Sequence, residues 1–172
     1  LLALSLALFH AHRDHAQLEN WMWDEAAGLW IGYLDSTSDT TSYGAELETT
    51  FDVNSHVQLF ANLGWLHNEV DSIAAFDLDL AQFVDKQDRD QAKSPAYQYN
   101  VGTRLAFGDQ WSGRIEFEGR DDSYYGYYHD GKLDDYHLVN ASAQWQSGAI
   151  AITLWGRNLN DEDYAVHGLY FA

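Results

Sequence analysis

Apolar and polar residues alternate along several segments of the chain, most clearly between Trp111 and Arg120. In that segment Ile115 and Phe117 share one set of alternate positions with Trp111, and the other set is charged. The charged residues are Arg114, Glu116, Glu118 and Arg120. Successive side chains of a β-strand point to opposite faces, so the segment is predicted to have one apolar and one charged face. The apolar face packs in the core of a soluble sandwich, but it faces lipid in an outer-membrane barrel whose charged residues line a wet interior.

Six further segments repeat this period of two and are predicted to be strands. They are residues 2–8, 43–53, 56–68, 97–107, 136–146 and 149–157. Phe60 is the one clear departure, because it falls among the polar positions of its segment. The sequence therefore predicts about seven strands.

The connections between the predicted strands alternate in length. Short turns at 53–55, 108–110 and 147–148 contain residues that tight turns favour, whereas 16–42, 70–96 and 121–135 are long and polar. A compact soluble domain rarely tolerates loops of about 20 residues without a functional reason. Short turns at one end and long loops at the other predict an all-β fold, an antiparallel up-and-down transmembrane β-barrel segment with short periplasmic turns and long extracellular loops.

Aromatic residues support this interpretation. The chain of 172 residues holds 7 Trp, 11 Tyr and 8 Phe, and abundant Trp and Tyr are expected at a membrane boundary. Phe51, Phe107, Trp111 and Trp145 flank the short turns, and Tyr43, Trp65, Tyr97 and Tyr99 lie near the long loops. These two groups are predicted to form two aromatic girdles. No run of about 18 apolar residues encodes a transmembrane helix.

Composition narrows the classes of partner. The formal net charge is −18, which argues against nucleic acid because phosphate binding needs basic residues. Cysteine is absent, so disulfides and thiolate metal sites are excluded. The apolar opening resembles a signal peptide, but it lacks a leading Met, a basic start and an A-x-A site, and it is interpreted as a strand.

The polar positions of the predicted strands are expected to face the lumen. They include Glu46, Glu48, Arg104, Arg114, Glu116, Glu118, Arg120 and Arg157. Glu116 and Glu118 share a face, as a general acid and base would, but arginines share that face too. Ion pairs among lumen-facing charges explain Arg114, Glu116, Glu118 and Arg120 without catalysis. The G-x-S-x-G motif of a serine hydrolase is also absent from the sequence. No enzymatic activity and no cofactor are expected.

Two groups of residues are candidate metal ligands. His10 and His12 share a strand face, with His15 just beyond, and two ring nitrogens at this spacing suit a transition metal. A fourth ligand is not evident from the sequence, so rim histidines where the strand leaves the membrane are expected instead. Several aspartates crowd one long loop without the spacing of an EF-hand, and a solvated acidic loop is expected. These aspartates are Asp77, Asp79, Asp85, Asp88 and Asp90. No metal site is predicted.

Aromatic residues in the long loops are the candidates for ligand contact. Exposed rings above a barrel mouth suit a small-molecule ligand held by stacking, although loops packed on one another would explain the same rings. The candidates are Trp21, Trp23, Trp30, Tyr124, Tyr125, Tyr127 and Tyr128.

The run from Gly156 to Tyr164, GRNLNDEDY, and the following GLYF resemble the C-terminal barrel of TonB-dependent outer-membrane receptors. The residues of this signature are Gly156, Arg157, Asn158, Leu159, Asp161 and Tyr164. Residues 43–48 are similar to the family's G-x-E-x-E strand, and 94–97 to its P-x-Y strand entry. Three motifs in family order cover most of the chain.

The resemblance implies a bacterial outer-membrane barrel of about 22 strands with an internal plug. Such a receptor imports scarce ligands, such as ferric siderophores or cobalamin, with energy from TonB. Residues 1–172 are then expected to be a partial, C-terminal part of the barrel without the plug, the TonB-contacting segment and the final strand. The expected partners are outer-membrane lipid, the plug and remaining strands, TonB and a small-molecule ligand such as a metal chelate. A small outer-membrane pore or adhesin, and a soluble β-domain with a binding face, are the alternatives.

Overall fold

The computed structural model describes residues 1–77, 80, 82–127 and 130–168. Within these residues the chain forms strands and connections, and no helix is long and apolar enough to cross a membrane. The strands are β1 (Leu2–Asp24), β2 (Leu29–Asp52), β3 (Val57–Asp77), β4 (Gln82–Asp90), β5 (Tyr97–Phe107), β6 (Trp111–Arg120), β7 (Ser123–Tyr124), β8 (Lys132–Leu133), β9 (Tyr136–Ser147) and β10 (Ile150–Gly156).

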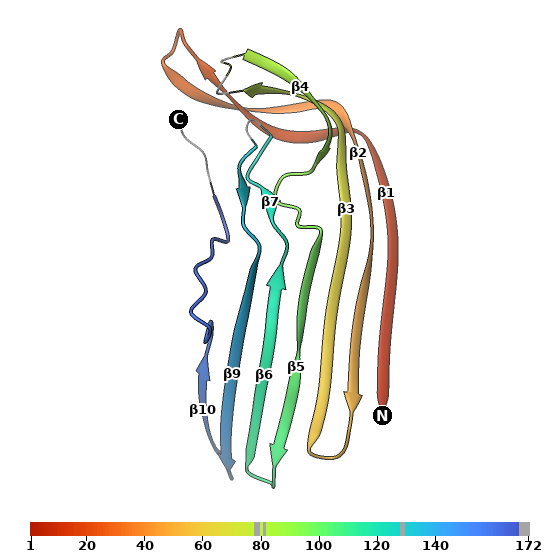
Figure 1. Cartoon of the computed structure of the whole chain (residues 1–172), viewed down its shortest axis with the longest axis vertical. Coiled ribbons are helices and arrows are strands. Elements are labelled where there is room, and N and C mark those ends of the chain that lie inside the picture. The colour runs from red at the N-terminus through yellow and green to blue at the C-terminus, as the bar shows by residue number, and fades with distance from the viewer. Residues whose placement is uncertain (78–79, 81, 128–129, 169–172) are drawn as a thin grey trace.

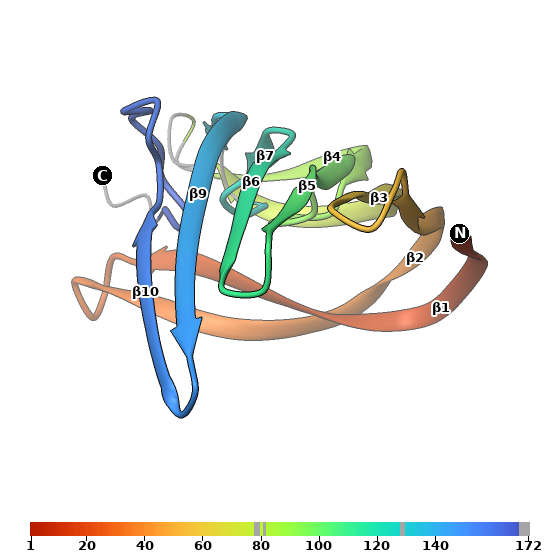
Figure 2. The same cartoon turned by 90° about the horizontal axis from the view of Figure 1, so that it is seen from below.

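Seven strands lie side by side in the order β1-β2-β3-β5-β6-β9-β10, and every neighbouring pair is antiparallel (Figure 1). β4 pairs with the far part of β3, and β7 with β8 makes a separate ribbon. The sheet is curved, and β1 and β10 lie at its two edges rather than against each other (Figure 2). The predicted all-β, up-and-down architecture is confirmed, as an open segment of a barrel.

β5 and β6 have the predicted limits, but β1, β2 and β3 continue well beyond theirs. Most of 16–42 continues β1 and β2, and only residues 25–28 turn. Asp24 closes this turn, since its Oδ1 accepts hydrogen bonds from Ala26 N at 2.9 Å and Ala27 N at 3.0 Å. The long connection predicted over 16–42 is therefore a paired hairpin over most of its length, and β3 and β4 likewise occupy much of the predicted 70–96 connection. Apolar residues occupy both sets of alternate positions in the extension, as Leu18 and Trp21 do, so alternation did not reveal it.

The extended β1–β2 hairpin bends and crosses the upper end of the sheet (Figure 1). The principal buried cluster lies in this region rather than in the wall, and it consists of Leu18, Val70, Ile73, Ala75 and Tyr127. We call the described residues of 16–38, 70–92 and 121–135 the loop cap. The cap has a hydrophobic core of its own, contributed by all three long connections.

Candidate functional site

The eight residues predicted to line a lumen lie on one face of the sheet, which we call the polar face. One row across it runs through Glu48, Asn62, Asn100 and Glu118. A second row runs through Glu46, Gly64, Gln98 and Arg120, and a third through Gln58, Arg104, Arg114 and Ser142. Glu116 pairs with Gly102, and Arg157 follows β10. That this face borders water inside a barrel stays a prediction.

The opposite face, which we call the outward face, is apolar and has nothing packed on it within the described chain. Ile115 is 42% exposed, Phe117 49% and Leu154 77%. The row Phe107, Trp111 and Trp145 ends this face beside the short turns, and Tyr43 with Trp65 ends it beside the cap. Ten steps of β5 separate Tyr97 from Phe107, about 33 Å of strand, or about 25 Å of height at a tilt of about 40°. This height matches the apolar band of an outer-membrane barrel, about 25 Å.

Glu116 and Glu118, the two candidates for a general acid and base, both form ion pairs with arginines. Arg114 Nε donates to Glu116 Oε2 at 2.7 Å, and Arg157 Nη2 donates to Glu118 Oε1 at 2.9 Å. Glu116 also accepts from Asn100 Nδ2 at 3.5 Å. Carboxylates engaged by arginines are acceptors of hydrogen bonds rather than proton donors. The arrangement is that of a neutralised wall lining.

Phe60, which broke the alternation, is only 4% exposed although it lies on the polar face. The guanidinium groups of Arg104 and Arg114 lie 4.7 Å and 4.6 Å from its ring centroid. Opposite it stands Gly102, which has no side chain to exclude the ring. The ring thus supports two arginines by cation–π contact, so the departure in the sequence marks a packing site on the wall.

The GRNLNDEDY run continues the pairing of β10 with β9 through asparagine side chains. Asn160 Oδ1 accepts from Val139 N and Asn160 Nδ2 donates to His137 O, both at 2.8 Å. Asn158 has a φ of 53° and accepts from Glu162 N at 2.9 Å. Its own backbone N donates to Asn140 Oδ1 at 2.9 Å. The asparagines replace regular ladder hydrogen bonds where the strand turns away.

Tyr164 closes the same segment against the wall. Its ring centroid lies 4.6 Å from that of Tyr136. The Arg120 guanidinium lies over Tyr136 at 5.1 Å, and Arg120 Nη2 donates to Ala165 O at 3.2 Å. The signature residues therefore perform a structural task at the end of the sheet.

The candidate loop aromatics differ in their surroundings. Trp23 and Trp30 pair across the hairpin with ring centroids 5.6 Å apart, and Trp21 lies over Gly32. Trp21 is 36% exposed and Trp23 37%. Half-buried Tyr125 lies against Gly168. The β1–β2 hairpin thus presents indole rings to solvent above the sheet.

The tyrosine cluster is packed into the cap. Tyr127 is 5% exposed within the buried core, and burial raises the pKa of its hydroxyl above 10.0. The Arg89 guanidinium lies 4.0 Å from the ring centroid of Tyr124, and Lys132 Nζ lies 4.6 Å from it. Tyr128 lies outside the described residues. For Tyr124 and Tyr127 the geometry favours a packing role over ligand contact.

A second set of contacts joins the segments of the cap, and no local sequence pattern predicts it. Asp130 Oδ1 accepts hydrogen bonds from Lys86 Nζ at 2.8 Å and from Arg89 Nη1 at 2.6 Å. Asp122 Oδ1 accepts from Lys132 Nζ at 2.9 Å, which raises the pKa of that lysine. The Asp130 contacts fasten the 121–135 connection to β4, whereas the Asp122–Lys132 pair closes that connection on itself.

Within the described residues, one group of three metal-ligating side chains gathers its potential ligand atoms within 4.8 Å, and it consists of His12, Asp14 and Asp39. His10 instead stacks on Tyr43, with centroids 6.5 Å apart. Asp79 lies outside the described residues, and Asp77, Asp85, Asp88 and Asp90 lie along β3 and β4.

The sequence matches the family described as TonB dependent receptor-like, beta-barrel over residues 1–159. No curated protein matches the chain. Among solved structures, the fold is similar to the siderophore receptor PiuA from Acinetobacter baumannii, with a TM-score of 0.72 and 14% identity over 96% of this chain and 23% of that one.

Two more structures share the fold. The ferric-catecholate import receptor Fiu from E. coli K12, in a closed form, has a TM-score of 0.66 and 15% identity over 96% of this chain and 22% of that one. The copper transporter OprC has a TM-score of 0.73 and 13% identity over 99% of this chain and 26% of that one. The chain thus spans about a quarter of the length of these proteins.

Proposed function

Because the chain belongs to the TonB-dependent receptor β-barrel family, we propose that it forms part of the wall of an outer-membrane receptor for energised uptake. In this proposal the outward face meets lipid, and the polar face lines a lumen that holds a plug. Further wall strands pair with the free edges of β1 and β10, since a bilayer does not tolerate unpaired backbone groups. TonB supplies energy through a segment outside these 172 residues.

The two-faced wall is the observation that carries this proposal. An unpacked apolar face between two aromatic belts would be a liability in water, because large exposed apolar patches promote aggregation. On the other face, Arg114 with Glu116 and Arg157 with Glu118 place charge where a watery interior can solvate it. A soluble sandwich would need a second sheet to cover Ile115 and Phe117.

The test is a pair of neighbouring substitutions in the full-length receptor. Phe117→Arg places a cation on the lipid face, where arginine costs about 2 to 4 kcal/mol near the bilayer midplane. Glu116→Gln changes the polar face only. Heat-modifiable migration of the barrel from outer-membrane fractions should be lost for Phe117→Arg and retained for Glu116→Gln. Equal tolerance of the two changes would refute the assignment of faces.

The proposed ligand is a metal chelate of the ferric siderophore or cobalamin class. Two solved relatives in fold are named as a siderophore receptor and a ferric-catecholate receptor, and a third as a copper transporter. Trp21 and Trp23 on the hairpin offer flat, exposed rings that suit aromatic or planar ligands. The function is therefore binding and passage rather than bond making.

Ligand contact is tested with Trp21→Ala and Trp23→Ala in the full-length receptor, with Trp111→Ala at the short-turn end as the control. Binding of a panel of ferric siderophores and cobalamin is measured by fluorescence quenching. The hairpin variants should bind at least about 10-fold more weakly, the loss expected when a contact worth about 1.4 kcal/mol is removed. A loss of ligand binding in Trp111→Ala alone would contradict the placement of the ligand at the hairpin.

A further inference from the structure

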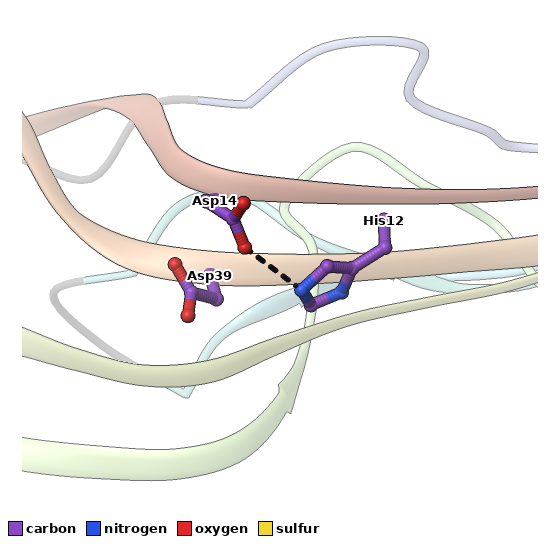
Figure 3. Close-up of side chains that lie close together, drawn as sticks. All are labelled: His12, Asp14 and Asp39. Carbon is purple, nitrogen blue, oxygen red and sulfur yellow. Dashed lines mark hydrogen bonds and ion pairs between the residues drawn. The ribbon is translucent and has the colours of Figure 1, made fainter.

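The β1–β2 hairpin leaves the wall at a β-bulge. Arg13 pairs with Thr40 and Ala16 with Ser38, so two residues of β1, Asp14 and His15, stand opposite Asp39 of β2. His15 has a φ of 54°, and its backbone N donates to Asp39 Oδ1 at 2.9 Å. Bulges re-aim the side chains beside them. Here the bulge brings Asp14 and Asp39 to the same side as His12 (Figure 3).

The three side chains offer one imidazole nitrogen and two carboxylates. Their potential ligand atoms all lie within 4.8 Å of one another, and His12 Nε2 is 3.1 Å from Asp14 Oδ1. Nitrogen and oxygen ligands lie about 2.1 Å from an ion such as Zn²⁺, so adjacent ligands are about 3.0 to 3.4 Å apart. Small rotations of exposed side chains bring the group to such spacing.

The second ring nitrogen of His12 already has a partner. His12 Nδ1 lies 3.1 Å from Thr41 Oγ1 on β2. With the proton on Nδ1, this nitrogen donates to the hydroxyl, and a cation takes the place of the proton that Nε2 otherwise shares with Asp14 Oδ1. A metal-bound histidine is commonly oriented in this way by a hydrogen bond from its other nitrogen. Asp39 likewise uses one oxygen for His15 N, which leaves Oδ2 available.

Charge favours a cation at this place. Among the described residues, neither Asp14 nor Asp39 forms an ion pair with a lysine or arginine. Two carboxylates gathered beside one imidazole repel each other unless a positive charge lies between them. The imidazole, in turn, favours a transition ion over Mg²⁺ or Ca²⁺, which prefer oxygen ligands alone.

We propose that His12, Asp14 and Asp39 bind a divalent first-row transition ion of the Zn²⁺ class at the base of the β1–β2 hairpin. The ion joins β1 to β2 at the bulge, where their regular pairing is interrupted. Water occupies its remaining positions, since the site is exposed. Binding fixes the angle at which the hairpin, and with it Trp21 and Trp23, crosses the upper end of the sheet.

The test is Zn²⁺ titration calorimetry on the detergent-solubilised full-length receptor after chelator treatment. Asp39→Asn keeps an oxygen for His15 N but removes a charge, and His12→Gln keeps a hydrogen-bonding group near Thr41. Each should weaken one Zn²⁺ site at least about 10-fold relative to wild type. His10 lies two residues before His12, and its ring stacks on Tyr43. His10→Gln is therefore the matched control and should leave that site unchanged.

A second measurement separates binding at this place from zinc bound elsewhere. Zn²⁺ should slow backbone hydrogen exchange over residues 16–38 in the wild-type receptor and in His10→Gln, but not in Asp39→Asn. Unchanged Zn²⁺ binding and exchange in both ligand variants would overturn the proposal, as would equal binding of Ca²⁺ in place of Zn²⁺. Neither readout depends on ligand uptake, so failure here leaves the proposed receptor function standing.

Discussion

Phe60 on β3 and Gly102 on β5 are partners in the sheet, and the ring of Phe60 covers the glycine. A Cβ built on Gly102 would lie 2.7 Å from Phe60 Cζ and 2.2 Å from the backbone oxygen of Ile115. Neither distance occurs between real atoms without movement. The absence of a side chain at residue 102 is therefore what allows the ring, and the two arginines above it, to lie against the wall.

Gly102→Ala should accordingly destabilise the barrel wall. Overpacking of this kind costs about 1 to 3 kcal/mol, because ring or backbone must move. The control is Gly64→Ala on β3, where the nearest atom to a new Cβ is Gln98 O at 3.9 Å. Urea unfolding of the receptor in detergent, followed by tryptophan fluorescence, should show a lower midpoint for Gly102→Ala only.

Phe60→Leu should weaken the support of Arg104 and Arg114. Leucine retains much of the buried apolar volume but loses both cation–π contacts, each worth about 0.5 to 1 kcal/mol at a site open to water. The expected loss of stability is about 1 to 2 kcal/mol in the same unfolding experiment. The control variant is the same change in a receptor that already carries Arg104→Gln and Arg114→Gln, where the loss should be smaller because neither cation–π contact is present. Equal loss in the two variants would show that the arginines do not rest on the ring.

Asn160→Ala should detach the segment that follows β10. The side chain makes two hydrogen bonds to the β9 backbone, at Val139 N and His137 O. Each contributes about 0.5 to 1.5 kcal/mol to stability. Hydrogen exchange of the Val139 amide should accelerate in Asn160→Ala, whereas Asp163→Ala, at an exposed position nearby, should leave it unchanged.

Acid should release the 121–135 connection from β4. Hydrogen bonds from Lys86 and Arg89 lower the pKa of the Asp130 carboxyl from 3.8 to about 2. Because the folded pKa is the lower one, the stabilisation is fully present above pH 3.8 and is lost as pH falls toward 2. Asp130 is largely exposed, so the effect should be about 1 kcal/mol or less.

The measurement is the protection of the 121–135 amides against hydrogen exchange, corrected for intrinsic rates, in wild type and Asp130→Asn. Wild type should lose protection between pH 4 and 2. The variant should have reduced protection at neutral pH and no step in this range. A step of the same size in the variant would assign the acid response to another carboxyl group.

The sequence was most informative where one local rule governs structure. Alternation between Trp111 and Arg120 depends only on neighbouring residues, so the limits and faces of β6 could be predicted. The short turns and the seven-strand order follow from the same local signals. The extension of β1 and β2 was missed because its apolar residues, such as Leu18 and Trp21, do not keep to one set of alternate positions.

The contacts that assemble the cap and the cluster at the bulge join residues far apart in the sequence. Asp130 reaches Arg89 across 41 positions. Asp39 lies near His12 only because of a β-bulge in β1, and neither strand's sequence alone predicts that bulge. Phe60 is an intermediate case, since its break in alternation was visible but its partner, Gly102, was not.

The position of the buried core has a consequence for how this chain responds to its surroundings. Leu18, Val70, Ile73 and Tyr127 bury apolar surface within protein, so the cap obeys the temperature and denaturant dependence of a small water-soluble domain. The wall below has no such core, and under the proposed function it takes its stability from lipid contact and strand pairing. In the proposed membrane setting, the cap is therefore solvated by water and the outward face of the wall by lipid. Bilayer thickness should affect the stability of the wall and leave that of the cap largely unaffected.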